Sequence, residues 1–334
     1  MNWFEAKEEE FSPVISTRVR FARNLSGKKF PRKMTPKEKK EVCEAVRGAL
    51  RDREPMFVDF GKASKGEKEA YVQTYLASRE LADKGEGSGL LISREGNVSV
   101  MLCEEDHVRL QAVLKGKKIR ACYELALDWE KALEEKIDVA YDPALGYLTA
   151  CPTNLGAAMR VSVMIHLPAL KETGRLYALT RSLNDLGFTV RGLFGEGSEG
   201  TAGIYQISNQ MSRDAAPEEI VSSFEKVVEQ VILEEEKARA ALFSDSRTIW
   251  EDKICRAMGI VSFARSMSFA EWIELYSLIR LGKEAGLPEA ARFSDPDRCL
   301  IEAMPAYLLL RDASLSSPQL RDEARAARLH ESIK

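Results

Sequence analysis

The sequence has little of what marks zinc-binding, secreted or membrane proteins. It holds three histidines, and its six cysteines are widely scattered with no CxxC pair, so neither a zinc site nor a disulfide framework is expected. No run approaches the roughly 18 apolar residues of a membrane span. The opening MNWFEAKEEEF also lacks the basic flank and apolar stretch of a signal peptide. We therefore expect a cytoplasmic protein with no membrane association.

An excess of positive charge is also missing. The 334 residues carry 49 Lys and Arg against 52 Asp and Glu, whereas dedicated nucleic-acid binders usually have a basic excess. Direct nucleic-acid binding is not expected. The Walker A pattern and the HRD and DFG motifs of protein kinases are absent too, so those two routes to ATP chemistry are not supported. With 45% hydrophobic residues, the chain can form one large domain and a smaller one.

What is present predicts an α+β protein with its strands in the first two thirds and helices at the end. Thr35, Pro36 and Glu38 form a capping box that opens a helix. The other elements are expected as strands over 14–25, 56–60, 160–165, 188–191 and 203–210, a hairpin over 89–103, and helices over 67–81, 120–137 and 175–186. From 217 on, apolar residues at helical spacing predict helices over 217–243, 248–258, 269–285, 297–311 and 318–333.

Arginines recur at the ends or on one face of the predicted strands. Arg18 and Arg20 alternate with apolar residues, so a strand places both on one face. Arg160 begins its strand behind a Pro-Thr-Asn-Leu-Gly turn, which suits an anion held at a strand end. Arg109 and Arg191 occupy similar positions. The alternative for each is an ordinary solvated arginine.

Carboxylates accompany these arginines. Glu104 and Glu105 directly follow a predicted strand, and Glu196 lies in a glycine-rich loop; a solvated acidic face is the alternative reading. Transfer of a phosphoryl group to a basic nitrogen needs both kinds of group. Guanidinium groups with Mg²⁺ neutralise a triphosphate, while carboxylates orient an acceptor whose pKa lies above about 12 and take its proton.

Five segments in this order carry a family resemblance: STRVRFARNL, CEEDHVRLQ, CPTNLGAAMRVSV, RGLFGEGSE and YQISNQ. They resemble the phosphagen (guanidino) kinases, and in particular their bacterial branch, the protein-arginine kinases. The resemblance implies a mainly antiparallel sheet flanked by helices, with ATP and Mg²⁺ as cofactors. It also implies a catalytic domain over 13–240 and a helical C-terminal domain over 241–334 that serves dimerisation and phosphoarginine binding.

The resemblance also assigns roles to single residues. It makes Glu105 the catalytic base, Glu196 a second glutamate that orients the acceptor, Cys151 the active-site cysteine and Glu104 a residue near the Mg²⁺ shell. The nucleotide site implied by it comprises Ser16, Thr17, Arg18, Val19, Arg20, Arg109, Arg160, Val161, Ser162, Val163, Met164, Arg191, Gly192, Leu193, Phe194, Gly195 and Glu196.

Two features favour protein arginine over a free metabolite as the acceptor. Phosphagen kinases for creatine or arginine carry a helical domain before the SxRVR motif, whereas about a dozen residues precede Pro13 here. The hexapeptide RDEARA at 321–326 fits the RDxxRA motif through which the bacterial branch binds phosphoarginine allosterically, by Arg321, Asp322 and Arg325. A solvated helix face is the alternative for that hexapeptide.

We therefore expect an ATP-dependent kinase that phosphorylates accessible arginines of proteins and marks them for Clp-type degradation under stress. The alternatives are a kinase for a small guanidino compound and a catalytically silent phosphoarginine-binding regulator. The resemblance further implies a homodimer, a zinc-binding activator protein, a heat-shock repressor as a target and a Clp ATPase as partners.

The chain departs from the family pattern at positions around the expected nucleotide site. Cys103 replaces the Asn of NEEDH, Ala157 and Ala158 replace Thr-Gly, and Tyr75 stands where relatives have a nucleotide-contacting His. MSRDAAPEE at 211–219 lacks the usual Thr-Leu-Gly pattern. None of these changes removes an arginine or glutamate that the chemistry needs, so nucleotide affinity is the property we expect them to alter.

Overall fold

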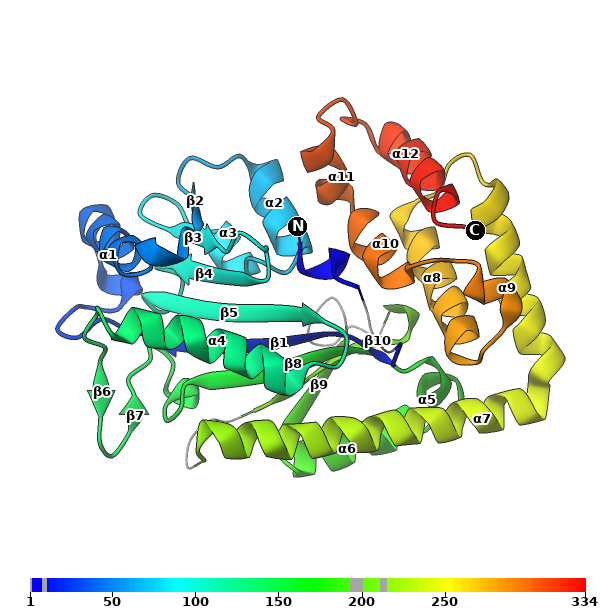
Figure 1. The fold of residues 1–334 in the computed structure, drawn as a ribbon, viewed down its shortest axis with the longest axis horizontal. Helices are drawn as coiled ribbons and strands as arrows, with labels where there is room; N and C mark the ends of the chain where they lie inside the picture. The colour runs from blue at the N-terminus through cyan, green and yellow to red at the C-terminus, as the bar shows by residue number, and fades with distance from the viewer. Residues whose placement is uncertain (1, 8–10, 193–200, 211–214) are drawn as a thin grey trace. The chain divides into compact units, whose positions relative to one another are not determined.

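The computed structural model describes residues 2–7, 11–192, 201–210 and 215–334, and within them eight strands form one sheet in the order β2-β3-β4-β5-β1-β8-β10-β9 (Figure 1). The pairings β1–β5, β2–β3, β3–β4 and β4–β5 are antiparallel. The predicted antiparallel sheet flanked by helices is confirmed. The strands are β1 (Val14–Arg23), β2 (Met56–Asp59), β3 (Gly89–Ile92), β4 (Val98–Leu102), β5 (Val108–Lys115), β8 (Met159–His166), β9 (Phe188–Gly192) and β10 (Ile204–Asn209), with a separate hairpin of β6 (Tyr141–Asp142) and β7 (Gly146–Tyr147).

Helices lie in several connections between strands, and from residue 217 on the described chain consists of helices joined by short non-helical segments. None of the described helices is long and apolar enough to cross a membrane. The α-helices are α1 (Pro36–Ala49), α2 (Lys65–Gln73), α3 (Arg79–Ala82), α4 (Ile119–Glu134), α5 (Pro168–Glu172), α6 (Leu176–Asp185), α7 (Pro217–Phe263), α8 (Phe269–Glu284), α9 (Pro288–Ala291), α10 (Pro296–Glu302), α11 (Pro305–Arg311) and α12 (Pro318–His330). Single 3-10 turns are η1 (Trp3–Glu5), η2 (Pro31–Lys33), η3 (Arg51–Arg53), η4 (Pro152–Asn154) and η5 (Thr201–Gly203).

The chain divides into two compact units that interleave in sequence. The first takes Met1–Lys7, Ser16–Val163 and Ser208–Lys226, and the second takes Glu8–Ile15, Met164–Ile207 and Val227–Lys334. In the first unit, α4 packs on β5 through an apolar face that includes buried Cys122, Ala126 and Trp129 (Figure 1). Each unit has its own buried core.

Local sequence signals account for most element boundaries. Thr35 caps α1 as expected, accepting from the Glu38 backbone N–H while Glu38 reaches back to the Thr35 N–H. The single helix predicted over 67–81 is wrong: α2 ends at Gln73, because Tyr75 takes a left-handed backbone with φ 60°. The helices predicted over 217–243 and 248–258 correspond to the two parts of α7, which meet at a kink where Ser246 leaves helical geometry with φ -147° and ψ 40°.

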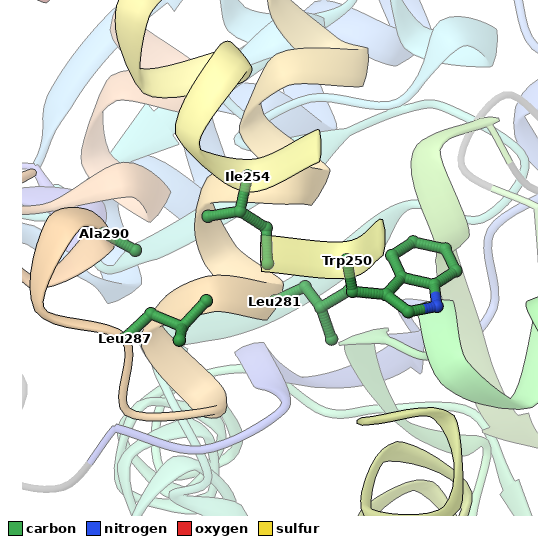
Figure 2. Packing of buried hydrophobic residues seen from close by; sticks show 5 residues of the cluster. All are labelled: Trp250, Ile254, Leu281, Leu287 and Ala290. Atoms are coloured by element: carbon green, nitrogen blue, oxygen red, sulfur yellow. The ribbon is translucent and has the colours of Figure 1, made fainter. Parts of the chain in front are cut away.

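The helical part of the second unit has a packed apolar core. Trp250 and Ile254 of α7 meet Leu281 of α8 and the short α9 (Figure 2). A Cβ on Gly282 would lie 2.7 Å from both the Ala290 Cβ and the Ile254 Cγ2. The close approach of these helices therefore requires glycine at this position. The single helix predicted over 297–311 is two, α10 and α11, because Pro305 begins a new helix.

Candidate functional site

Strand register brings three of the predicted arginines to one face of the sheet. In the antiparallel β1–β5 pair, Ala22 lies opposite Arg109 and Arg20 lies opposite Gln111. Residues directly opposite each other share a face, and side chains alternate along each strand. Arg18, Arg20 and Arg109 therefore extend from the same face, as the alternation along β1 predicts.

A pocket opens at this face. Among its lining residues are Arg20 and Arg109, Arg160 at the start of β8, and Glu105 in the loop after β4. Arg160 is held by β10, where its Nε donates to the Asn209 carbonyl oxygen at 3.2 Å. The remaining lining residues are Phe21, Ala22, Asp106, Thr153, Asn154, Ala158, Met159, Asn209 and Gln210.

The arginines of this cluster repel one another. Burial, followed by the charges of Arg109 and Arg160, lowers the pKa of Arg18 to about 10. Burial, followed by the charges of Arg18, Arg109 and Arg160, lowers the pKa of Arg20 well below its usual value. The Arg20 Nε is buried and has no hydrogen-bond partner in the described part of the chain. Partly desolvated guanidinium groups that repel one another favour the binding of an anion with several negative charges.

The carboxylate of Glu104 partly balances the positive charge of the arginine cluster. It is buried at 2% exposure, accepts from Arg109 Nη1 at 2.6 Å, and takes a second hydrogen bond from the Ser78 hydroxyl. Burial would raise the pKa of Glu104, but Arg109 and these hydrogen bonds leave it lowered. Both oxygens therefore have protein donors, and Glu104 fixes the orientation of Arg109. Its predicted place near Mg²⁺ stays a prediction.

Glu105 differs sharply from its neighbour. Its side chain is exposed at the edge of the pocket, and partial burial together with the charge of Asp106 raises its pKa. Asp106 is buried and accepts from Asn24 Nδ2 at 2.6 Å and from the Ala150 N–H at 2.7 Å. The acidic run, residues 104–106, thus contains an exposed carboxylate with a raised pKa, Glu105, next to a buried carboxylate, Asp106, which is fixed by hydrogen bonds.

The loop that leads to Arg160 is tied to β1. The Ala22 N–H donates to the Ala158 carbonyl at 2.9 Å, and Arg23 Nη1 donates to the Ala157 carbonyl at 3.3 Å. Arg23 is itself buried, paired with Glu130 and stacked on the ring of Tyr147. The sequence pattern did not single out Arg23 for this role, although the density of arginines in 18–23 is a signal.

Comparison with known proteins places this site in a family. The model of the ATP:guanido phosphotransferase C-terminal catalytic domain matches residues 37–238, and that of the protein-arginine kinase McsB C-terminal domain matches residues 247–334. The protein-arginine kinase of Pelotomaculum thermopropionicum is 34% identical over 97% of this chain and 93% of its own length. The chain belongs to the protein-arginine kinase family. The corresponding enzyme of Caldanaerobacter subterraneus subsp. tengcongensis is 37% identical over 94% of each chain.

Solved structures agree on the fold. A lombricine kinase superposes with a TM-score of 0.60 at 23% identity, covering 68% of this chain and 67% of its own. The substrate-free duplicated taurocyamine kinase of Schistosoma mansoni gives 0.59 at 22% identity, covering 78% of this chain and 39% of its own. At these identities the likeness establishes the guanidino kinase fold and nothing further.

Several residues predicted for the nucleotide site do not line this pocket with their side chains. Thr17 binds the Gly116 carbonyl at 2.8 Å, and Ser162 lies 3.4 Å from the Arg18 carbonyl. Seven predicted residues are buried in the two strands instead: Ser16, Thr17, Val19, Val161, Ser162, Val163 and Met164. Arg191 and Gly192 end β9 of the second unit. The predictions for Leu193, Phe194, Gly195 and Glu196 lie outside the described residues.

Cys151 stands close to the pocket without lining it. It precedes η4, whose Thr153 and Asn154 do line the pocket, and its sulfur lies 3.0 Å from the Thr153 hydroxyl. Asn209 was not predicted as a site residue, although it ends the YQISNQ segment. Its side-chain oxygen accepts from the Val161 N–H at 2.8 Å and its amide donates to the Met159 carbonyl, so it fixes β8 on both sides of Arg160.

Three departures from the family pattern share one backbone feature. Tyr75, Cys103 and Ala158 have φ angles of 60°, 55° and 48°, in the left-handed region where Gly and Asn are most at ease. Cys103 and Ala158 stand where the resemblance places Asn and Gly. The chain thus retains the left-handed backbone with residues that adopt it less readily. Burial raises the pKa of Tyr75 to about 12, against the effect of Arg18.

The predicted phosphoarginine residues Arg321, Asp322 and Arg325 all lie in α12. Arg325 is 1% exposed and donates to the carbonyls of Ala303 at 2.8 Å and Met267 at 2.6 Å, as well as to Asp322 at 2.5 Å. Arg321 donates to two carbonyls of the segment before α12. In this conformation both guanidinium groups donate to backbone carbonyls and connect α12 to neighbouring segments of the chain. Their role as an allosteric site stays a prediction.

Proposed function

We propose that this protein is an ATP-dependent protein-arginine kinase. The observation that carries the proposal is the group of four strand-borne arginines, partly balanced by Glu104, beside the exposed carboxylate of Glu105. Such an arrangement suits a polyphosphate on one side and a cationic acceptor on the other. Membership of the protein-arginine kinase family supports arginine side chains of proteins as the acceptor.

The arginine cluster would hold the phosphates of ATP. Arg18, Arg20, Arg109 and Arg160 supply forked donors that match phosphate oxygens, and the unpartnered Arg20 Nε fits an acceptor supplied by a ligand. Resemblance adds Arg191 to them. Mg²⁺ would neutralise further charge on the transferring group. Because Glu104 already binds Arg109 and Ser78, we place Mg²⁺ with the nucleotide or on water rather than directly on this carboxylate.

Glu105 would act as the base. A substrate guanidinium must lose a proton to become a nucleophile, and a carboxylate with a raised pKa accepts it more readily. As the proton moves to Glu105, the acceptor nitrogen attacks the γ-phosphorus, the nitrogen–phosphorus bond forms, and the bond to the bridging oxygen breaks with ADP leaving. By resemblance, Glu196 orients the acceptor and Cys151 is the active-site cysteine.

The remaining assignments rest on the family. We propose a catalytic domain over 13–240 and a C-terminal domain over 241–334 that serves dimerisation and binds phosphoarginine through Arg321, Asp322 and Arg325. A cytoplasmic location agrees with the finding that no described helix can cross a membrane. A zinc-binding activator, a heat-shock repressor and a Clp ATPase are the partners that this function implies.

Phosphate transfer from Mg-ATP to two acceptors in parallel tests the proposal. The acceptors are an arginine-rich unfolded protein and free arginine, and the products are identified by mass spectrometry without acid, because the nitrogen–phosphorus bond is acid-labile. Phosphoarginine on the protein is the expected result. Transfer to free arginine alone would assign a small guanidino substrate instead, and binding of phosphoarginine peptides without any transfer would indicate a regulator.

A further inference from the structure

Two cysteines meet directly beside the acidic run. Cys103 is the residue before Glu104, and its thiol lies 3.7 Å from the Lys39 carbonyl of α1. Cys43, one turn further along α1, donates to the Gly87 carbonyl at 3.4 Å. The two side chains interact, and this interaction lowers the pKa of Cys43 and raises that of Cys103. Cys43 is 5% exposed and Cys103 is 0% exposed.

The other described thiols have different surroundings. Cys122 donates to backbone carbonyls of the sheet, and Cys299 pairs with the Ser332 hydroxyl. Cys255 is exposed on α7. Within the described part of the chain, neither Cys122 nor Cys299 hydrogen-bonds another thiol. Cys103 is also the residue that replaces the family's Asn, so a dithiol at this place is a property of this chain and is not inherited from the family pattern.

We propose that Cys43 and Cys103 form a reversible disulfide on exposure to a peroxide, and that this bond slows phosphate transfer by displacing Glu104 and Glu105. The disulfide is independent of the proposed function, while its effect on rate rests on that function. Thiol contact is the geometric requirement for such a bond, because Cys side chains that point apart cannot be bridged without backbone movement.

The atoms balance with hydrogen peroxide as the oxidant. Interaction with the Cys103 thiol lowers the pKa of Cys43, so Cys43 is the sulfur that attacks the peroxide and becomes a sulfenic acid, releasing one water. The Cys103 sulfur then attacks the Cys43 sulfur. The sulfur–sulfur bond forms, the sulfur–oxygen bond breaks, and the oxygen leaves as a second water with the Cys103 proton. A dithiol reductant reverses the reaction.

The position of Cys103 explains the expected loss of activity. Its φ is 55°, and its N–H donates to the His107 carbonyl at 2.9 Å, closing the turn that carries the acidic run. Bond formation pulls the Cys103 sulfur from the Lys39 carbonyl to Cys43 and moves this turn. A displacement of about 1 Å near reacting groups can cost about 10²-fold in rate, so we expect a loss of about tenfold or more.

Peptide mapping after hydrogen peroxide treatment tests the disulfide itself. The full-length protein is treated, its free thiols are blocked, and it is digested without reductant. A linked Cys43–Cys103 peptide pair that dithiothreitol releases is the expected result, formed more slowly than exposed Cys255 is oxidised. Cys43 and Cys103 that both stay free and blockable when the treatment continues well beyond full oxidation of Cys255 would overturn the proposal. This readout does not depend on kinase activity.

Rate measurements on the same samples test the effect on transfer. We expect C43S and C103N to lose the dithiothreitol-reversible part of the inhibition, and C255S to retain it. C103N installs the residue of the family pattern, which accepts the left-handed backbone, so it guards against a folding defect in C43S. Equal reversible inhibition of wild type, C43S and C103N would place the inhibition at another thiol such as Cys151 and overturn the regulatory half of the proposal.

Discussion

Two regions of this molecule hold inward-facing arginines, half-buried in the first and fully buried in the second, with opposite electrostatic results. In the first unit, Arg18 and Arg20 face other arginines, and burial with these like charges lowers the pKa of both. In the second unit, Arg280 is fully buried but donates to Asp297 at 2.8 and 3.0 Å and pairs with Glu284. Although burial opposes it, these carboxylates leave the pKa of Arg280 well above its usual value.

The difference separates binding from scaffolding. A buried arginine whose donors are met by carboxylates holds elements together, as Arg280 joins α8 to α10 and to the Ser12 carbonyl. A half-buried arginine that faces other arginines destabilises the free protein and gains its partner from a ligand. Electrostatic balance therefore distinguishes the two regions where residue type does not.

Replacing Glu105 should have the largest effect. We expect Glu105→Gln to lower the rate of transfer by on the order of 10²- to 10⁴-fold, because a neutral amide cannot accept the acceptor's proton. Stability should change little, since the side chain is exposed. The measurement is initial rate with Mg-ATP and an unfolded protein. Glu95→Gln, at an exposed turn of the β3–β4 hairpin, is the control, and equal rates for the two variants would remove Glu105 from the mechanism.

Replacing Arg280 should have the next largest effect, on stability. We expect Arg280→Met to lower the free energy of unfolding by about 3–5 kcal/mol, because it leaves Asp297 buried without its arginine and Glu284 with Arg239 as its arginine partner. Denaturant unfolding measures the change. Arg256→Met removes an exposed pair with Asp252 in the same unit and should cost at most about 0.5 kcal/mol. Similar losses in both variants would contradict the contrast drawn here.

Glu235 adds a pH dependence to the second region. Burial raises its pKa from 4.5 to about 8, although it accepts from the N–H groups of Ala169 and Leu170. Between those two pH values the folded protein keeps a proton that the unfolded chain has lost, so its contribution to stability falls as pH rises. We expect Glu235→Gln to gain stability relative to wild type from pH 5 to pH 8. The exposed Glu236→Gln should show no such trend, and parallel pH profiles for all three proteins would refute the assignment.

Backbone strain beside the first region should give the smallest effect. Ala158 has φ 48°, a conformation that costs an L-residue about 1–2 kcal/mol. Removing its buried methyl group offsets part of the relief, so we expect Ala158→Gly to raise the free energy of unfolding by less than about 1 kcal/mol. Ala157, whose φ is not positive, should lose stability as glycine. Losses of equal size at both positions would show that the strain is absent.

Local periodicity predicted the strands and the place of the main arginines on them, while the antiparallel sheet was implied by the family resemblance. Alternation along β1 is enough to put Arg18 and Arg20 on one face. The pairing of Glu104 with Arg109 spans only five residues, whereas the support of Arg160 by Asn209 depends on which strands become neighbours. The burial of Arg325 in carbonyl contacts likewise follows from tertiary packing. A single sequence carries no direct signal for these long-range contacts.

Nucleotide-induced stabilisation of wild type and Arg20→Met tests the central claim most directly. Without nucleotide, we expect Arg20→Met to be at least as stable as wild type, because the substitution removes a buried cation that faces three others. Mg-ATP at about 100 times its dissociation constant should stabilise wild type by about 2.7 kcal/mol and the variant much less at the same concentration. A variant that is less stable than wild type without nucleotide, yet gains as much from Mg-ATP, would show that Arg20 belongs to the scaffold and contradict the account.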